Sequence, residues 1–400
     1  MPNCWRPVVC TRAFTDFSSQ KPHENSPHRS LEFLRGVFVV KILHTEASCG
    51  WGGQEIRILE ESRGLIGRGH EVGVACPAHA RMATEAARFG VPVTALPIEF
   101  KTVAGFRALR RHLAAARPDV VNTHSSADSW LVALACATLP APPAIVRTRH
   151  ISAPVSGNFA NRWLYRQARG VATTGESLRR HLLDTLGLDP ARVASVPTGI
   201  DTERYAPAEK AAAKAALGLS PQERHIGIVA TLRSWKGHLY LLDAFARLTQ
   251  PQLRLLIVGE GPMRAPIEER VAALGLAERV SFAGQRNDPE HWLQALDVFC
   301  LPSYANEGVP QAILQAMLCG LPIVTTPVGA ILEAVADGDT ALVVPPRDAT
   351  ALAAAIGRLL DDAALAARLG TAARRRASAD FSMESMLDRM EATFRRAASP

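Results

Sequence analysis

The stretch that decides the fold is "NEGVPQAILQAMLCGLPIVTT", residues 306–326. Pro310 suits the first turn of a helix, because its missing N–H has no partner there and its φ is already helical. Gly320 and Pro322 end this helix, and "PIVTT" follows as a buried strand. Between the two signals, apolar side chains recur at helical spacing: Ile313, Leu314, Met317 and Leu318.

The residues just ahead of this helix are the ones that an anionic ligand would meet. Glu307 and the backbone amides of Gly308 and Val309 are predicted to lie at the helix N-terminus. Free N–H groups and the helix dipole favour an anion at that place. The alternative is an N-terminal cap that binds no ligand.

Composition limits the class of protein. A chain of 400 residues is long enough for two domains, and 48% hydrophobic with 21% charged residues is typical of a soluble globular protein. No apolar run reaches the ~20 residues that a membrane span needs. The seven cysteines show no CxxC pair and no zinc-like spacing, so we interpret them as reduced thiols of a cytosolic protein.

Positive charge is concentrated in the first half of the chain. Residues 1–200 hold 24 Lys and Arg against 15 Asp and Glu, whereas the second half is close to neutral. The helix expected at residues 102–116 is flanked or covered by Lys101, Arg107, Arg110, Arg111 and Arg117. This helix is either an ordinary solvated outer face or a basic surface that docks on anionic lipid. Nucleic acid is disfavoured, because no aromatic stacking strip or recognition motif accompanies the charge.

Alternating strands and helices organise most of the sequence. A strand at residues 37–43 runs into a loop with Gly50, Gly52 and Gly53 and then a helix to residue 64. The alternation restarts near residue 223, with a helix expected at 238–248. This pattern predicts an α/β protein with two doubly wound, Rossmann-like domains that face a cleft.

The first 36 residues differ from the rest. They are polar and rich in Pro and Ser, without apolar periodicity, so we expect them to be disordered or a misassigned leader. They contain no apolar core of the kind found in a secretory signal. Deleting them is expected to leave folding and activity unchanged.

The order of "WGGQE", "NTHSS", "VPTGID", "LRSWKGH", "LLIVGEGP", "FAGQ" and "NEGVPQAILQAMLCGLPIVTTPVG" resembles the family-4 glycosyltransferases of GT-B fold, over about residues 40–390. The resemblance implies transfer of a sugar from a nucleotide diphosphate sugar, with retention and without a metal or other cofactor. The subset that builds bacterial lipopolysaccharide and envelope glycans is the most similar. The implied division is a leader (1–36), an N-terminal acceptor-side domain (37–202), a linker (203–222), a C-terminal nucleotide-sugar-binding domain (223–380) and a C-terminal helix (381–400) that returns to the N-terminal domain.

The residues fit that chemistry. A diphosphate leaving group needs cations beside it, and Arg233 and Lys236 follow a strand whose end points into the cleft. The family often has an earlier arginine where this chain has Thr231, so Arg233 is its less direct match. Gly52 and Gly53 let the backbone approach a phosphate or sugar, or else they serve only a tight turn.

Three further groups are carried over from the resemblance. His124 matches an acceptor-side histidine near the reacting carbon, with a purely structural histidine as the alternative; His150 is a weaker candidate. Gly284 and Arg286 lie in a turn that matches a loop contacting the nucleotide base, or is plain turn chemistry.

The family's two-glutamate motif is only half kept. Glu307 is present at the first position, and Gln315 occupies the second. The resemblance implies that Glu307 contacts the donor sugar or stabilises developing positive charge, and that Gln315 hydrogen-bonds the ribose hydroxyls.

The sequence therefore predicts a cytoplasmic glycosyltransferase, peripheral on the inner face of the plasma membrane. Its partners would be a nucleotide sugar donor, a lipid-linked or glycan acceptor and an anionic membrane surface, without nucleic acid. The alternatives are a nucleotide-sugar epimerase or sugar phosphorylase of the same fold, and a non-catalytic nucleotide-sugar-binding module.

Overall fold

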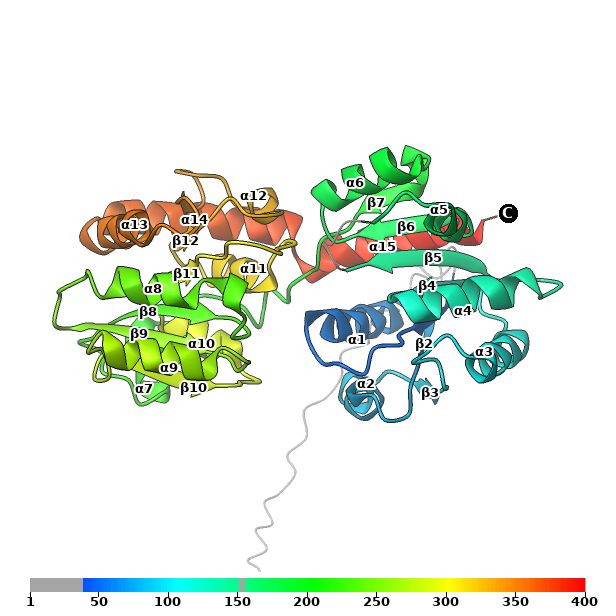
Figure 1. The fold of residues 1–400 in the computed structure, drawn as a ribbon, viewed down its shortest axis with the longest axis horizontal. Coiled ribbons are helices and arrows are strands. Elements are labelled where there is room, and N and C mark those ends of the chain that lie inside the picture. The colour runs from blue at the N-terminus through cyan, green and yellow to red at the C-terminus, as the bar shows by residue number, and fades with distance from the viewer. Residues whose placement is uncertain (1–38, 151–154, 400) are drawn as a thin grey trace, which may run out of the picture. The chain divides into compact units, whose positions relative to one another are not determined.

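The structure is a computed structural model that describes residues 39–150 and 155–399 (Figure 1). The 36-residue leader and the expectation that it is dispensable lie outside these residues. Among the described helices, none is long and apolar enough to cross a bilayer. The five cysteines in the described ranges are free thiols.

The first sheet has seven parallel strands in the order β3-β2-β1-β4-β5-β6-β7. The strands before β4 are added on one side of β1 and the later strands on the other side, so the strand order reverses between β1 and β4, as in doubly wound sheets. Its strands are β1 (Lys41–Thr45), β2 (Glu71–Cys76), β3 (Val93–Ala95), β4 (Val120–Thr123), β5 (Ala144–Arg149), β6 (Gly170–Thr173) and β7 (Val193–Ser195). Its helices are α1 (Gly53–Gly67), α2 (Arg81–Glu85), α3 (Val103–Ala116), α4 (Ser126–Ala137), α5 (Phe159–Arg166) and α6 (Glu176–Leu186), with the 3-10 turns η2 (Ala86–Phe89) and η3 (Pro190–Arg192).

The second sheet has six parallel strands in the order β10-β9-β8-β11-β12-β13. Its strands are β8 (Arg224–Val229), β9 (Leu253–Val258), β10 (Val280–Gly284), β11 (Val298–Leu301), β12 (Ile323–Thr325) and β13 (Leu342–Val343). The helices around it are α7 (Lys210–Ala216), α8 (His238–Phe245), α9 (Arg264–Ala273), α10 (Pro289–Ala295), α11 (Gln311–Leu318), α12 (Ile331–Ala334), α13 (Ala349–Asp361) and α14 (Ala363–Asp380), with the 3-10 turn η4 (Ser234–Lys236).

Both faces of the first sheet are buried, and the last helix covers part of one face. That helix, α15 (Met383–Ala398), is drawn in red beside the green strands of the first sheet (Figure 1). Met386, Met390 and Phe394 pack with Val40 and Val146 in one buried cluster. The predicted return of the C-terminal helix to the N-terminal domain is confirmed, as are the two Rossmann-like domains.

Several element bounds differ from the sequence prediction. The first strand begins at Lys41 rather than at residue 37, and α1 continues to Gly67, three residues past its predicted end. Helix α8 ends at Phe245, before the predicted residue 248. These shifts are of the size expected where frayed ends are read from periodicity alone.

Two local differences have a physical reason. Pro310 is not in the first turn of α11 but is its N-cap, with ψ at 123°, so the helix begins one residue later. Within the predicted linker, residues Lys210–Ala216 form α7, because Lys214 is buried and its ammonium donates to Asp297 at 2.9 Å. That partner lies 83 residues along the chain and gives no local signal.

Candidate functional site

An ion pair joins two of the predicted site residues at the carboxyl end of the second sheet. Lys236 Nζ donates to Glu307 Oε1 at 2.7 Å and to Oε2 at 3.0 Å. Ser303 Oγ also donates to Glu307 Oε1, at 2.6 Å. The Glu307 side chain is 5% exposed and that of Lys236 is 19% exposed. The carboxylate is therefore held by two donors, and the ammonium still faces solvent.

Two glycines bring the backbone segments of this pair together. Gly237 follows Lys236 with φ of +80°, and a Cβ at that position would lie 2.0 Å from the carbonyl oxygen of Pro302. Gly329 has φ of +60°, and a Cβ there would lie 2.0 Å from the carbonyl oxygen of Glu307. Any larger residue would push either segment away. The ion pair is thus positioned by backbone contact as well as by side chains.

The other predicted donor-side residues lie in loops of the same domain. Gly284 ends β10 with φ of +70°, and its carbonyl accepts from Gly259 N at 2.9 Å. The Arg286 guanidinium lies 4.8 Å from the centre of the Trp292 ring, and that of Arg233 lies 5.8 Å from the Trp235 ring. These arginines stack on aromatic faces of their own domain and are not joined to the Lys236–Glu307 pair by a hydrogen bond among the described residues.

Gln315 lies on α11 and has a protein partner. Its Nε2 donates to the Tyr205 hydroxyl at 3.0 Å. Tyr205 is 5% exposed and packs in the core of the second sheet. One amide proton of Gln315 is therefore committed to the protein, and its oxygen is the group that a ligand hydroxyl would meet.

Ahead of α11, Gly308 and Val309 connect Glu307 to the helix. Val309 is 9% exposed and belongs to the core of the second sheet, whereas Gly308 is half-buried. Because α11 begins at Gln311, the amides of both residues precede the helix and are not consumed by its first turn.

The glycine loop of the first sheet leads into α1. Gly52 is the N-cap of α1 and Gly53 its first residue, and the Gly53 carbonyl accepts from Gln311 Nε2 at 3.1 Å. The loop is held by Glu46, which accepts from Ser48 N at 2.7 Å and from Gln54 Nε2. Burial and the nearby Asp128 raise the pKa of Glu46 to about 8. The carboxyl beside this loop is therefore protonated at neutral pH.

Three histidines form a hydrogen-bonded ladder at the carboxyl ends of β1, β4 and β5. His44 Nδ1 lies 2.9 Å from His124 Nε2, and His124 Nδ1 lies 2.8 Å from His150 Nε2. The His44 and His124 rings are stacked, with centroids 5.2 Å apart. The sequence singled out His124 and, more weakly, His150, and the structure joins them through direct contact.

Neighbouring polar groups favour one set of protonated ring nitrogens. Thr148 Oγ1 donates to Asn122 Oδ1 at 2.9 Å, which turns the Asn122 Nδ2 amide toward His44 Nδ1 at 3.4 Å. His44 Nδ1 is then an acceptor, so His124 donates through Nε2 and accepts from His150 at Nδ1. In this arrangement both ring nitrogens of His124 are occupied by other imidazoles.

Burial keeps the ladder uncharged. Desolvation lowers the pKa of His44 to about 3, and burial followed by the neighbouring imidazoles lowers that of His124 well below its usual value. Arg57 on α1, itself 1% exposed, adds to the lowering for His124 and His150. A protonated ladder would place additional positive charge in the core, so the imidazoles act as neutral donors and acceptors.

One carboxylate anchors the loop that carries His124. Asp128 accepts from His124 N at 2.9 Å and from Thr45 Oγ1 at 2.8 Å through Oδ2. Its Oδ1 accepts from Ser125 N and Ser125 Oγ, completing a capping box at the start of α4. The end of β4 is therefore fixed to the end of β1 through this side chain.

Sequence reasoning missed four side chains of these constellations. His44, Glu46, Asp128 and Ser303 were not singled out, although all are at least nine-tenths buried. For His44 and Glu46 a signal existed, because polar "HTE" follows directly on the apolar run "VVKIL" at a strand end. Ser303 in "LPSYANE" has the same strand-end placement after "DVFC".

The two halves of the chain match two different family models. Residues 209–376 match the model of the family described as "Glycosyl transferases group 1", and residues 51–204 match "Glycosyltransferase Family 4". The chain is 35% identical over 231 residues to D-inositol 3-phosphate glycosyltransferase of Nocardia farcinica, covering 54% of this chain and 50% of that protein. It is 34% identical over 196 residues to the lipopolysaccharide core biosynthesis mannosyltransferase LpsB of Rhizobium meliloti, covering 46% of this chain and 56% of that protein.

A solved structure agrees on the fold. Anabaena Alr3699/HepE, crystallised with UDP and glucose, superposes with a TM-score of 0.76 at 21% identity, covering 89% of this chain and 99% of that one. The chain spans about half the length of the curated relatives it matches. The two sheets and the two matched families together define a class, the GT-B proteins. The chain belongs to the family-4 glycosyltransferases.

Proposed function

We propose that this chain transfers a sugar from a nucleotide diphosphate sugar to a glycan or lipid-linked acceptor, with retention at the anomeric carbon. The observation that carries the proposal is the Lys236–Glu307 pair at the carboxyl end of the second sheet. Ligands of doubly wound sheets bind at that edge. The pair offers a cation for a diphosphate and a carboxylate for a sugar in one place.

The chemistry assigns opposite tasks to the two charges. The bond between the anomeric carbon and the diphosphate oxygen breaks, the acceptor oxygen bonds to that carbon, and the acceptor's proton passes to the departing diphosphate. Negative charge grows on the leaving group, where Lys236 and Arg233 would stabilise it. Positive charge grows on the sugar ring, where the Glu307 carboxylate would stabilise it.

Each of the remaining donor-side residues would contact a different part of the nucleotide sugar. Gln315 would accept from a ribose hydroxyl through its oxygen, because its amide already donates to Tyr205. The turn with Gly284 and Arg286 would contact the base, and the Gly52–Gly53 loop would approach the transferred sugar. HepE was crystallised with UDP, so a uridine nucleotide is the first donor to test.

The acceptor side is assigned to the first sheet. The ladder through His124 supplies neutral hydrogen-bonding groups that suit an uncharged hydroxyl. For His124 to touch the acceptor directly, its hydrogen bond to His150 must open. The names of the relatives offer two acceptor classes for testing, an inositol phosphate and a lipopolysaccharide core; we propose the envelope glycan.

A turnover assay tests this function. The purified chain is incubated with a panel of nucleotide sugars, with and without each acceptor, and released nucleotide and glycosylated product are measured. We expect product and nucleotide in equal amounts, with the acceptor required. Conversion of the donor without any acceptor would indicate an epimerase, and binding without nucleotide release would indicate a non-catalytic module.

We also propose that the chain acts in the cytoplasm, peripheral on the inner face of the plasma membrane, through α3. Phe100, which precedes this helix, and Val103, its first residue, are each 66% exposed. Arg107, Arg110 and Arg111 on the helix are exposed too, and Arg110 also donates to Thr138 Oγ1 at 3.0 Å. Exposed apolar groups beside basic ones suit an anionic bilayer surface.

Vesicle sedimentation tests the membrane proposal. Arg110→Glu with Arg111→Glu should release the chain from anionic vesicles, more so at high salt, while activity on a soluble acceptor analogue survives. The matched control is Arg368→Glu with Arg375→Glu, which lies on α14. Equal vesicle binding by parent and test variant would leave α3 as an ordinary solvated helix.

A further inference from the structure

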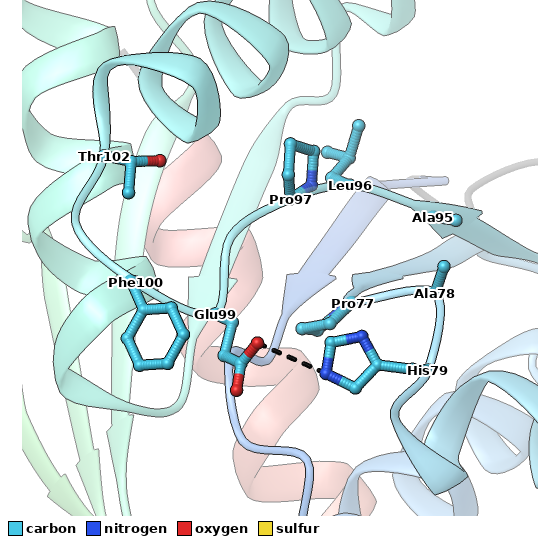
Figure 2. A pocket seen from close by; sticks show the side chains of 9 residues that line it. All are labelled: Pro77, Ala78, His79, Ala95, Leu96, Pro97, Glu99, Phe100 and Thr102. Carbon is cyan, nitrogen blue, oxygen red and sulfur yellow. Dashed lines mark ion pairs between the residues drawn. The ribbon is translucent and has the colours of Figure 1, made fainter.

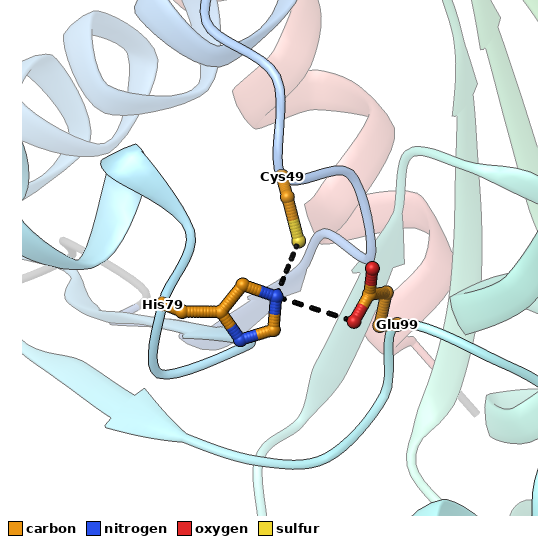
Figure 3. Close-up of side chains that lie close together, drawn as sticks. All are labelled: Cys49, His79 and Glu99. Carbon is orange, nitrogen blue, oxygen red and sulfur yellow. Dashed lines mark hydrogen bonds and ion pairs between the residues drawn. The ribbon is translucent and has the colours of Figure 1, made fainter.

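Three metal-ligating side chains meet at one edge of the first sheet. Cys49 Sγ lies 3.3 Å from His79 Nε2, and Glu99 Oε2 lies 3.2 Å from the same nitrogen. All three ligating atoms are within 4.8 Å of one another. Figure 3 shows the sulfur and the carboxylate pointing toward the same ring nitrogen. None of these residues has a task in the glycosyl transfer proposed above.

The topology of the sheet explains why they meet. Cys49 follows the end of β1, His79 follows β2 and Glu99 follows β3. The three strands are parallel neighbours, in the order β3-β2-β1, so the loops after them leave from the same edge. The sequence does not predict the cluster, because 30 residues separate Cys49 from His79.

Two of the three ligand–ligand distances are close to those of a tetrahedral zinc site. With Zn–S of about 2.3 Å and Zn–N of about 2.0–2.1 Å, tetrahedral ligands would have sulfur and nitrogen about 3.6 Å apart. Nitrogen and a carboxylate oxygen would be about 3.4 Å apart by the same geometry. The observed 3.3 and 3.2 Å are within a few tenths of an ångström of these edges.

The Glu99 carboxylate faces both of the other side chains: it lies 3.2 Å from His79 Nε2 and is a hydrogen-bond partner of the Cys49 thiol. A bound cation would replace these contacts. A divalent cation between the three atoms is attracted to all of them at once.

We propose that Cys49, His79 and Glu99 bind a Zn²⁺ ion, with a fourth position open to an exchangeable ligand. Cysteine, histidine and carboxylate are the ligand types that zinc accepts, and three protein ligands with one open position are typical of sites that exchange a ligand. The site is independent of the proposed glycosyl transfer, and its test needs neither donor nor acceptor.

Two of the three proposed ligands also line a pocket. His79 and Glu99 also line a pocket of about 390 Å³ together with Pro97, Phe100 and Thr102. Figure 2 shows the His79 and Glu99 side chains turned toward each other among the residues that line this pocket. The His79 side chain is 67% exposed, so water or an oxygen of a molecule in the pocket can complete the coordination.

The loops are held in place by their own hydrogen bonds. Ser48 Oγ accepts from Gly50 N at 3.0 Å, which fixes the turn that carries Cys49. Ala80 N donates to the Pro77 carbonyl at 3.0 Å around His79. Thr102 N donates to the Phe100 carbonyl at 2.8 Å next to Glu99. The three ligands are thus presented from formed turns, which limits the ordering that binding requires.

Burial and the Glu99 carboxylate raise the pKa of the Cys49 thiol. A bound metal ion deprotonates a coordinating thiol and releases that proton.

Titration of the full-length chain with Zn²⁺ against a chromophoric chelator, and with Co²⁺ as a spectroscopic probe, tests the proposal. We expect one metal per chain and a near-ultraviolet cobalt–thiolate band. Cys49→Ser should abolish the band, and His79→Ala should weaken Zn²⁺ binding by more than the roughly 10–100-fold that loss of an outer-shell partner costs. Zn²⁺ should raise the melting temperature of the parent and not that of Cys49→Ser.

Matched variants identify the site. The double variant Cys4→Ser with Cys10→Ser removes the two cysteines outside the described residues and should keep the full band. His291→Ala removes an exposed histidine elsewhere and should bind Zn²⁺ as the parent does. Absence of stoichiometric binding, a band that survives Cys49→Ser, or a band lost in the Cys4/Cys10 variant would each overturn the assignment.

Discussion

The histidine ladder and Glu46 at the carboxyl end of the first sheet are neutral, whereas Lys236 and Glu307 at the carboxyl end of the second sheet are charged. At the first sheet, burial keeps the histidine ladder neutral and raises the pKa of Glu46 to about 8, so that it is protonated. At the second sheet, Lys236 and Glu307 form an ion pair. The difference matches the two substrates of the proposed reaction, because an acceptor hydroxyl is neutral and a diphosphate is charged. Variants that alter charge at each end test this comparison.

The largest effect is expected at the charged end. Glu307→Gln keeps the shape but removes the charge that would stabilise the developing positive sugar. Turnover should fall by roughly 10³-fold with a modest change in donor affinity, because the interaction is strongest in the transition state. Steady-state kinetics and donor titration measure the two effects separately.

A matched exposed carboxyl serves as the control for that variant. Glu269→Gln on α9 should retain parental turnover. A fully active Glu307→Gln would show that the ion pair only caps and positions the loop before α11.

The next effect is expected in the ladder. His124→Asn should lower turnover by about 10²-fold, the lower end of the range for groups that handle protons. Because burial lowers the pKa of the ladder well below 6.5, the parental pH–rate profile should show no limb from these histidines between pH 6 and 8. The control His112→Asn changes a half-buried histidine on α3. A limb near pH 6.5 that disappears in His124→Asn would contradict a neutral ladder.

The third prediction concerns stability and pH. Between pH 5 and 7 the folded chain keeps a proton on Glu46 that the unfolded chain releases near the ordinary pKa of 4.5. The parent therefore loses stability as the pH rises through this window, by about 1.4 kcal/mol per pH unit from this group. Glu46→Gln lacks that proton. The difference between its unfolding free energy and that of the parent should therefore increase in favour of Glu46→Gln as the pH rises.

Denaturant unfolding at pH 5, 6 and 7 measures this difference, and the histidines cancel because both chains contain them. Glu71→Gln, an exposed carboxyl on β2, should follow the parent at every pH. A constant offset between Glu46→Gln and the parent would mean that Glu46 is already ionised at pH 5.

The smallest effect is expected at Gln315. Gln315→Ala should weaken donor binding by about 1–2 kcal/mol for the lost hydrogen bonds, with turnover of bound donor nearly unchanged. Gln315→Glu should bind donor at least as well. Tyr205→Phe removes only the hydrogen bond between Tyr205 and Gln315. It therefore shows how much of the effect comes from positioning the Gln315 side chain and how much from its contact with the donor. Equal donor affinity in Gln315→Ala and the parent would remove this residue from the binding site.

The two ends also differ in how far the sequence could predict them. Lys236 and Glu307 each stand at a recognisable strand-to-helix turn, so the sequence could place both at the carboxyl end of the second sheet, but their ion pair was not predicted. The ladder depended on contacts that the sequence does not display, since His44 and His124 are 80 residues apart and His44 belongs to an ordinary strand end. Likewise, α7 was read as linker because its burial depends on Asp297, far along the chain.

The return of α15 to the first sheet has a consequence for synthesis on the ribosome. Val40, just before β1, and Ile42 in β1 pack in one buried cluster with Met390 and Phe394 of α15. The N-terminal domain therefore cannot complete its core while the second domain is being made. Its apolar face stays uncovered until α15 has left the exit tunnel, so the first domain completes its core only after α15 has been made.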